Sequence, residues 1–311
     1  MNSSNKKSNE PHSIDQFGEQ RDFWWNRDFL DLMATRWRLG EASSLADIGC
    51  GLCHWSRLLY PYLRKPARFA GVDREERWVN EGLNKSSQCF PGAQPDLITF
   101  ARGDATTIPL PDDSFDVATC QTVLMHLEQP QKALSEMIRV LRPGGLLICV
   151  EPNNLWNYLA FSSLVAEEAL DVVARRFEFW LCYHRGKKAE GQGDHCIGDL
   201  LPGFFAQEGL QDISVYQSDR VASLFPPYAT SAQRASIKQD REWRQSGKGP
   251  WDPAEVRRQV LRGGGTAELF DRTFPELAQK YEAEQSAIKD GKFHAGNGGL
   301  LYLVSGRKPM K

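Results

Sequence analysis

Residues 45–53 read LADIGCGLC, a short apolar run that ends in two closely spaced glycines, Gly49 and Gly51. This pattern predicts a buried strand and a tight turn, because glycine reaches positive φ and lets backbone N–H groups approach a ligand. The next apolar run ends at Asp73, 22 residues after Gly51. A carboxylate at that spacing can accept hydrogen bonds from both hydroxyls of a ribose. We therefore expect a nucleoside-type ligand at this turn.

Short apolar runs alternate with amphipathic runs from residue 45 to residue 150. The alternation predicts an α/β fold with a doubly wound, Rossmann-like parallel sheet, whose ligand crevice lies beyond the carboxyl ends of the strands. We predict strands at residues 45–48, 69–72, 98–102, 115–120 and 146–150. Two later apolar runs predict further strands at residues 213–217 and 300–305.

The rest of the chain predicts helices around this core. Residues 1–44 are expected to form a flexible lead-in and a capping helix at 17–37, and residues 45–153 the core. Residues 154–210 are expected to form a helical substrate-lid insertion, with one helix at 158–181, a Gly-rich polar loop at 184–193 and a helix at 199–208. Residues 211–311 complete the sheet and carry a second helical insertion at about 226–295, including a charged helix at 266–290.

Composition narrows the class of protein. The chain has 311 residues, with 38 Lys and Arg against 40 Asp and Glu, so its charge does not favour nucleic acid as a partner. No long uncharged apolar run predicts a membrane span, and residues 1–22 lack the pattern of a secretory signal. Seven cysteines make an odd set that suits a reducing compartment. We expect a cytoplasmic protein.

Three further motifs follow in order along the chain. Gly103-Asp104-Ala105 follows the third predicted strand, QTVLMHL at 121–127 follows the fourth, and LRPGG at 141–145 precedes the fifth. Together with the Gly-x-Gly turn, they resemble the class I S-adenosylmethionine-dependent methyltransferases, particularly the branch of quinone-ring and natural-product small-molecule methyltransferases. The resemblance is strong over residues 45–153, about a third of the chain.

The resemblance implies a seven-stranded sheet and a cofactor site. Its last strand, residues 300–305, would run antiparallel beside the fifth. S-adenosyl-L-methionine would be bound, with S-adenosyl-L-homocysteine as the product, by residues that match the family's motifs: Asp47, Gly49 and Gly51 under the methionine and ribose, Asp73 and the adjacent Arg74 at the ribose, Asp104 and Ala105 at the adenine, and Gln121 near the methionyl group. Cys53 departs from the pattern, because the family usually has a third glycine there.

Methyl transfer is an in-line displacement on a sulfonium donor, so a base is optional and alignment matters most. The candidate bases, each with a non-catalytic alternative, are His126 after the fourth strand, Glu151 at the end of the fifth, and His184, Asp194 and His195 in the first insertion. His126 could instead pack at a helix start, and Glu151 could bind the N-terminus of the helix that follows it. The two lid histidines could be solvated surface residues.

Aromatic residues are candidates for an acceptor pocket: Trp25, Trp156, Tyr158 and Tyr183. Each could equally pack in the core or dock an insertion onto the sheet. The pairs Cys182-x-His184 and His195-Cys196 match none of the usual zinc spacings, so no metal is expected.

The leading hypothesis is a methyltransferase that acts on an oxygen or nitrogen of a small-molecule acceptor. An RNA or tRNA methyltransferase and a catalytically silent S-adenosylmethionine-binding protein are the alternatives. An NAD-dependent oxidoreductase is weaker, because His54 replaces the third glycine of a dinucleotide fingerprint. The sequence leaves the oligomeric state open between monomer and homodimer.

Overall fold

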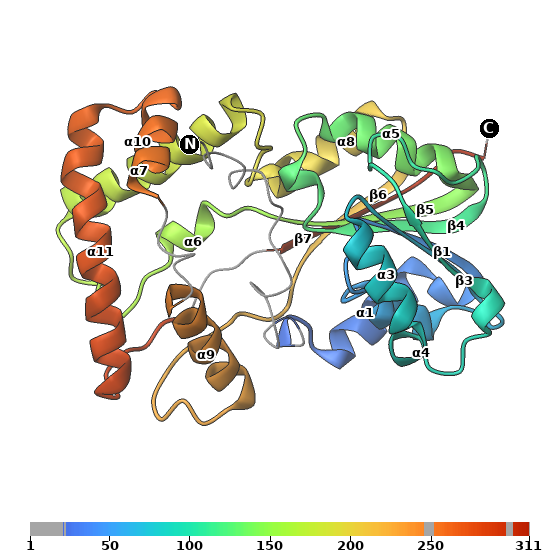
Figure 1. Cartoon of the computed structure of the whole chain (residues 1–311), viewed down its shortest axis with the longest axis horizontal. Helices are drawn as coiled ribbons and strands as arrows, with labels where there is room; N and C mark the ends of the chain where they lie inside the picture. Colours follow the sequence, from blue (N-terminus) through green and yellow to red (C-terminus); the bar gives the residue numbers. More distant parts are fainter. Residues whose placement is uncertain (1–20, 22, 246–251, 297–300, 311) are drawn as a thin grey trace, which may run out of the picture.

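The computed structural model describes residues 21, 23–245, 252–296 and 301–310, and a seven-stranded sheet lies at its centre (Figure 1). The strand order is β3-β2-β1-β4-β5-β7-β6. The strands are β1 Ser44–Ile48, β2 Arg68–Asp73, β3 Ile98–Arg102, β4 Phe115–Gln121, β5 Leu141–Pro152, β6 Gln211–Gln217 and β7 Leu301–Arg307. The first five are parallel, whereas β7 runs antiparallel to both β5 and β6. The predicted sheet is confirmed.

The central strands are mostly apolar because helices cover both faces of the sheet, so that side chains on either face are buried. Every residue of β1 is buried, including the polar Ser44 and Asp47. The chain order reverses between β1 and β4, which are neighbours in the sheet. A ligand crevice is expected at such a switch point, outside the carboxyl ends of these two strands.

Helices form a layer on each face of the sheet (Figure 1). One face is covered by α1 Arg27–Trp37, α2 Ser56–Leu59, α3 Glu76–Asn84 and α4 Ser86–Cys89. An apolar cluster on this face includes Met33, Trp37, Leu59 and Cys89, and α3 packs beside β3. On the other side, α5 Pro130–Val140 and α8 Leu201–Gln207 contribute Leu134, Met137 and Phe205 to a second. Short 3₁₀ turns complete the connections: η3 Leu39–Glu41, η4 Tyr60–Tyr62, η5 Pro95–Leu97, η6 Leu124–His126 and η7 Ile197–Leu200.

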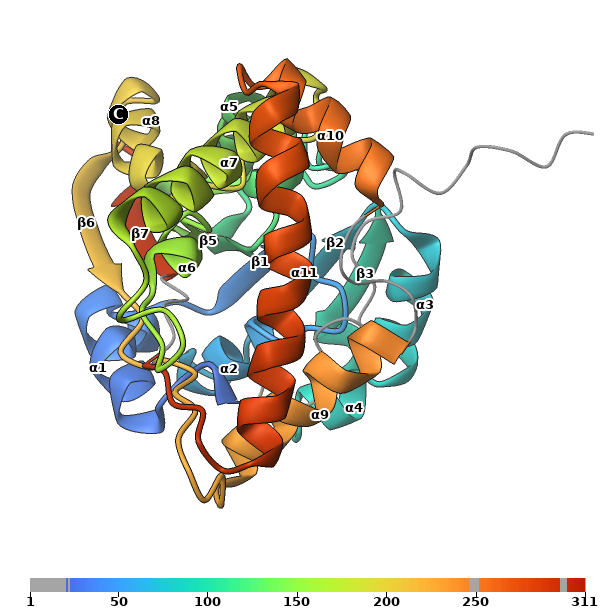
Figure 2. The same cartoon turned by 90° about the vertical axis from the view of Figure 1, so that its left-hand side faces the viewer.

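The remaining helices form a separate layer at one end of the sheet. They are α6 Trp156–Leu159, α7 Leu170–Ala189, α9 Ser231–Gln245, α10 Pro253–Arg262 and α11 Ala267–Lys289. Helices α7, α10 and α11 share their own apolar core, which includes Phe179, Val256 and Phe270. Figure 2 shows α11 running along this layer, with α7 and α10 beside its upper end. The two predicted insertions thus pack on each other, and no helix of the described ranges is long and apolar enough to cross a membrane.

Two predicted helices are wrong in their extent. The helix expected at 17–37 begins at Arg27, because Asn26 is extended and its side chain donates to Asp219 instead (2.8 Å); residues 17–20 lie outside the described part of the chain. The single helix expected at 158–181 is α6 and α7, separated by ten residues that form turns. Within them the Ala166 N–H donates to the Ser162 carbonyl (3.1 Å), and the Ser163 N–H donates to the His294 carbonyl of the second insertion (2.8 Å).

The Gly-rich loop predicted at 184–193 is also wrong, because α7 continues to Ala189. The chain leaves the helix through Glu190 and Gly191, whose φ of +74° favours glycine. The extra helical turn brings Lys187 onto the same face as Tyr183 and His184.

Gly186 sets how closely α7 and α10 approach. A Cβ added at Gly186 would overlap the backbone of Gln259, whereas a Cβ added at Gly203, in α8, would meet nothing within 4 Å. We expect Gly186→Ala to lower the free energy of unfolding by about 1–3 kcal/mol through overpacking. Gly203→Ala should raise it by about 0.5–1 kcal/mol, as usual within a helix. Urea denaturation followed by circular dichroism measures both; equal effects would contradict this packing.

Candidate active site

The loop after β1 is fastened to the end of β2 by backbone N–H groups. Those of Gly49 and Cys50 donate to the Val72 carbonyl, at 2.7 and 3.1 Å. The N–H of Gly51 donates to Oδ2 of Asp73 at 2.9 Å. The predicted Gly-x-Gly turn and the predicted acid therefore meet directly, which fixes the loop and orients the Asp73 carboxylate.

The loop depends on left-handed backbone at three positions. Gly49, Gly51 and Cys53 have φ angles of +69°, +49° and +59°. A Cβ at Gly49 would press on Val123, whereas the space beside Gly51 is open. Cys53, which stands where the family has a glycine, is buried and adopts the φ that glycine favours. The open side at Gly51 is where a ligand can approach the backbone.

The buried carboxyl group of Asp47 and the half-buried carboxyl group of Asp73 lie at this turn. Burial raises the pKa of Asp47 to about 7, and the neighbouring Asp73 adds to this effect. Burial also raises the pKa of Asp73, against which the N–H groups of Glu75 (2.9 Å) and Gly51 act. Acids in this setting favour ligands with hydroxyl donors or positive charge.

The expected adenine contacts lie on the next loop. The Gly103 N–H donates to the Asp73 carbonyl (3.0 Å), which places this loop beside the ribose candidate. Asp104 is exposed, and its Oδ1 accepts from the N–H (2.8 Å) and hydroxyl (2.6 Å) of Thr106, which lower the pKa of Asp104. Ala105 is half-buried, and Arg74 is exposed beside Glu75.

Gln121 ends β4, the strand beside β1. Its side-chain nitrogen Nε2 is buried and has no hydrogen-bond partner among the described residues. Leaving such a donor unpaired costs free energy, so a partner from outside the chain is expected. The donor at Gln121 and the acids at Asp47 and Asp73 together suit a nucleoside that carries an amino-acid group.

Glu151 holds the turn that follows β4. Its Oε1 accepts from the N–H groups of Val123 and Leu124 (both 2.8 Å), and its Oε2 accepts from Met125 (3.2 Å). The side chain is fully buried, and burial raises the pKa of Glu151 to about 7 against these hydrogen bonds. Glu151 therefore binds the N-terminus of η6, which precedes it in the chain.

The three candidate histidines lie in a row. The ring centroid of His126 is 5.3 Å from that of His195, which is 5.8 Å from that of His184. His195 and His184 are buried, and Gly193 lies against the backbone of Met125 and His126. The row connects the turn after β4 with the lid helix α7.

Two of the four aromatic candidates, Tyr158 and Tyr183, lie beside His184 in this row. Tyr158 stacks on Trp180 at 4.0 Å, and both Tyr158 and Tyr183 lie within 6 Å of the His184 ring centroid, at 5.7 and 5.2 Å. Trp25 instead packs against Trp55 in the core (5.0 Å). Trp156 is exposed.

Lys187 was not predicted, although it lies on the same face of α7 as Tyr183 and His184. Its ammonium is 5.7 Å from the ring centroid of Tyr183. Burial lowers the pKa of Lys187 to about 8, partly offset by Glu255. The residue would have been found had the sequence indicated that the helix continues past Leu181.

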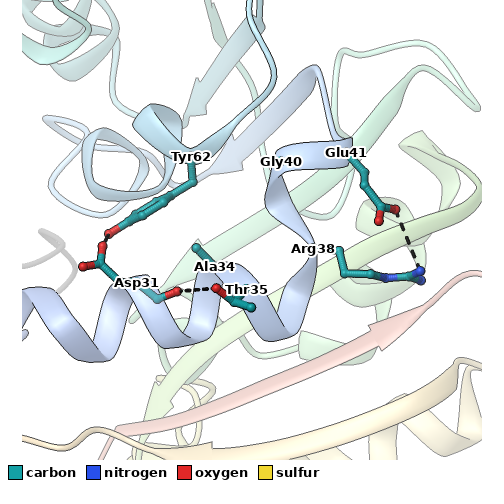
Figure 3. Close-up of a pocket in the computed structure, with 7 residues that line it drawn as sticks. All are labelled: Asp31, Ala34, Thr35, Arg38, Gly40, Glu41 and Tyr62. Carbon is teal, nitrogen blue, oxygen red and sulfur yellow. Dashed lines mark hydrogen bonds and ion pairs between the residues drawn. The ribbon is translucent and has the colours of Figure 1, made fainter.

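A surface pocket of about 470 Å³ lies elsewhere, beside α1 and η3 (Figure 3). Its polar groups pair with one another: the Tyr62 hydroxyl donates to Asp31, and Arg38 pairs with Glu41. Because residues 38–41 immediately precede β1, the pocket lies at the amino end of that strand, away from the switch point.

Comparison with known proteins gives a family for this core. A family model described as "Methyltransferase domain" matches residues 46–149. These residues include the end of β1, all of β2, β3 and β4, and every loop described above that carries a cofactor candidate. The chain carries a methyltransferase domain. The resemblance to methyltransferases that the sequence motifs indicated is thereby confirmed for residues 46–149.

The methyltransferase domain has relatives of known activity. The chain is 28% identical over 127 residues to a demethylmenaquinone methyltransferase of Listeria monocytogenes, covering 41% of this chain and 50% of the relative. It is 32% identical over 129 residues to the enzyme of the same description from Symbiobacterium thermophilum, covering 41% and 48%. The chain thus spans about half the length of the curated relatives it matches.

A solved structure supports the same fold. A Bacillus halodurans protein, provisionally described as a methyltransferase, aligns with 91% of this chain and 99% of its own, at a TM-score of 0.50 and 18% identity. At that identity the likeness concerns the fold.

The buried carboxyl group of Glu151, at the end of β5, predicts a pH dependence of stability. Its pKa rises from 4.5 to about 7 on folding, so the folded protein binds this proton more tightly than the unfolded chain. The resulting stabilisation is present below pH 4.5 and is lost as the pH rises to 7. We expect Glu151→Gln to reduce this loss by about 2–3 kcal/mol.

Urea denaturation at several pH values between 4.5 and 7.5 measures the effect. Glu167→Gln, on an exposed side chain, is the control and should retain the wild-type profile. A Glu151→Gln profile parallel to that of the wild type would contradict the assignment.

Proposed function

We propose that this chain is an S-adenosylmethionine-dependent methyltransferase that moves a methyl group to an oxygen or nitrogen of a small-molecule acceptor by in-line displacement. The observation that carries the proposal is the hydrogen bond from the Gly51 N–H to Asp73 (2.9 Å). It joins the predicted turn and the residue predicted to bind the ribose in one site. The match of residues 46–149 to a methyltransferase domain supports it.

In this proposal the chain binds the donor through groups that can form further hydrogen bonds. Asp73 accepts one backbone N–H on each oxygen, and each carboxylate oxygen has a further lone pair for a ribose hydroxyl. Gln121 offers its unpaired Nε2 to the amino-acid part, and Asp47 stands behind the turn as a buried acid. Asp104 keeps Oδ2 for the adenine while Oδ1 fixes its own turn.

Bound here, the donor would supply an electrophilic methyl group on a sulfonium sulfur. The chain would contribute alignment and exclusion of water, and alignment alone can lower a barrier by about 7–11 kcal/mol. Glu151 is best placed to position η6 through its three backbone hydrogen bonds, and His126 lies at the end of that turn.

The acceptor would lie between the carboxyl ends of the strands and the lid layer. The curated relatives are demethylmenaquinone methyltransferases, so a reduced quinone ring is the first acceptor to test.

Donor binding has a direct test at Asp73. Asp73→Ala removes the acceptor of the Gly51 N–H and the proposed ribose contact, so we expect at least about a hundredfold loss of S-adenosylmethionine affinity by isothermal titration calorimetry. Asp96→Ala, on the exposed turn η5, should bind as the wild type does. An affinity for Asp73→Ala within threefold of the wild type would rule out this placement of the site.

Turnover separates an enzyme from a silent binding protein. We expect conversion of S-adenosylmethionine to S-adenosylhomocysteine, followed by mass spectrometry, to depend on a small-molecule acceptor such as a reduced demethylated quinone or a simple phenol. Transfer to tRNA alone would support the RNA methyltransferase instead. Donor binding without transfer to any acceptor would support a protein that only binds the nucleoside.

A further inference from the structure

We propose that one face of α7, carrying Trp180, Tyr183, His184 and Lys187, is the acceptor site, and that it takes a planar aromatic molecule with an acidic hydroxyl group. Lys187 receives the hydroxyl proton in this proposal, and His184 orients the hydroxyl oxygen. The inference rests on the proposed methyl transfer for its chemistry, but the binding it predicts can be measured without the donor.

The four residues share a face because their spacing is that of a helix. Positions 180, 183, 184 and 187 follow the i, i+3, i+4, i+7 pattern, and all four lie within α7. Tyr158 of α6 stacks on Trp180 with an angle of 13° between the ring planes. The imidazole of His195 joins this face to His126 and so to the turn after β4.

His184 lacks the partners that a buried imidazole requires. The residue is 7% exposed, and neither ring nitrogen has a hydrogen-bond partner among the described residues. Its other neighbours are the rings of Tyr158, Tyr183 and His195. A ligand hydroxyl would satisfy one of these nitrogens.

Burial also keeps this imidazole neutral. It lowers the pKa of His184 to about 3, and Lys187 adds to the effect. A neutral imidazole accepts from a hydroxyl or donates to a phenolate but is a weak base. His184 therefore suits orientation of the oxygen rather than removal of its proton.

Lys187 suits the removal of that proton. Burial lowers the pKa of Lys187 to about 8, so a fraction of the side chain is a neutral amine near physiological pH. Once protonated, its ammonium would stabilise the phenolate in a setting shielded from water.

Other titratable groups face this site and bear on its pH dependence. They come from every surrounding segment: Tyr158 on α6, Tyr183 on α7, Glu255 on α10, Tyr281 on α11, and Asp194, His195 and Cys196 in the loop after α7. Glu255 favours the charged form of Lys187, and Asp194 favours the charged form of His184. Burial outweighs both.

The chemistry of these side chains indicates the class of ligand. Stacked and edge-on rings bind a planar aromatic molecule. An amine and a neutral imidazole bind a hydroxyl that ionises, as in a phenol or an enol. In the transfer, the hydroxyl proton goes to the lone pair of the Lys187 amine and the oxygen forms a bond to the methyl carbon. The carbon–sulfur bond breaks with its electron pair left on sulfur.

The experiment uses 4-nitrophenol and the full chain without donor. Calorimetry measures binding, and the absorbance of the bound probe reports its ionisation. We expect the wild type to bind the probe and to ionise it at a lower pH than in free solution. Lys187→Met should abolish that shift, and Lys289→Met, on an exposed side chain, should retain it.

His184→Phe separates binding from packing, because it keeps a ring and removes both unpaired nitrogens. We expect about a tenfold loss of probe affinity with an unchanged or higher Tm. His294→Phe, on an exposed side chain, should keep the wild-type affinity. A lower Tm for His184→Phe would mean that the imidazole is structural and would overturn the proposal.

The remaining outcomes separate this inference from the proposed function. Donor binding without probe binding would overturn the acceptor site and leave methyl transfer standing. The same conclusion would follow if the Lys187→Met and His184→Phe variants bound the probe as the wild type does. Probe binding with the expected shifts, but no donor binding, would uphold the site and refute the proposed function.

Discussion

The hydrogen bond from the Gly51 N–H to the Asp73 carboxylate joins the two central features of this protein, the left-handed turn after β1 and the acid that ends β2. It forms because β1 and β2 are parallel neighbours, so their carboxyl ends reach the same edge of the sheet. The same edge carries Gln121 at the end of β4 and the Glu151 carboxylate that holds the following turn. The donor contacts proposed at Asp73 and Gln121 thus lie at strand ends whose positions the strand pairing fixes.

The lid depends on a different constraint, the close approach of α7 and α10. Gly186 and Gly263 allow it, because an added Cβ at either position would overlap the backbone of the facing segment. Ion pairs between Arg175 and Glu276 (2.7 Å) and between Arg258 and Glu190 (2.8 Å), each with one largely buried member, connect the same two insertions. This packing fixes the rotation of α7 about its axis, and so decides that His184 and Lys187 face Tyr158 and His195.

The sequence predicted the sheet and the tight turn after β1 well, because both arise from local patterns. Apolar runs of strand length mark buried parallel strands, and closely spaced glycines mark a turn that needs positive φ. The lid was predicted poorly, because its helix ends depend on contacts between distant segments. Residues near Ser163 bond to the His294 segment, a pairing that no local pattern records. Ending the helix at Leu181 hid Lys187, although the candidates His126, His184 and His195 had been identified one by one.

A crystal structure with S-adenosylhomocysteine tests the central claim most directly. The account predicts the ribose hydroxyls on the Asp73 carboxylate, the backbone of Gly51 against the ligand, and the Gln121 amide nitrogen donating to its amino-acid part. A ligand bound elsewhere on the chain, or one in the crevice that leaves Asp73 and Gln121 without contact, would contradict it.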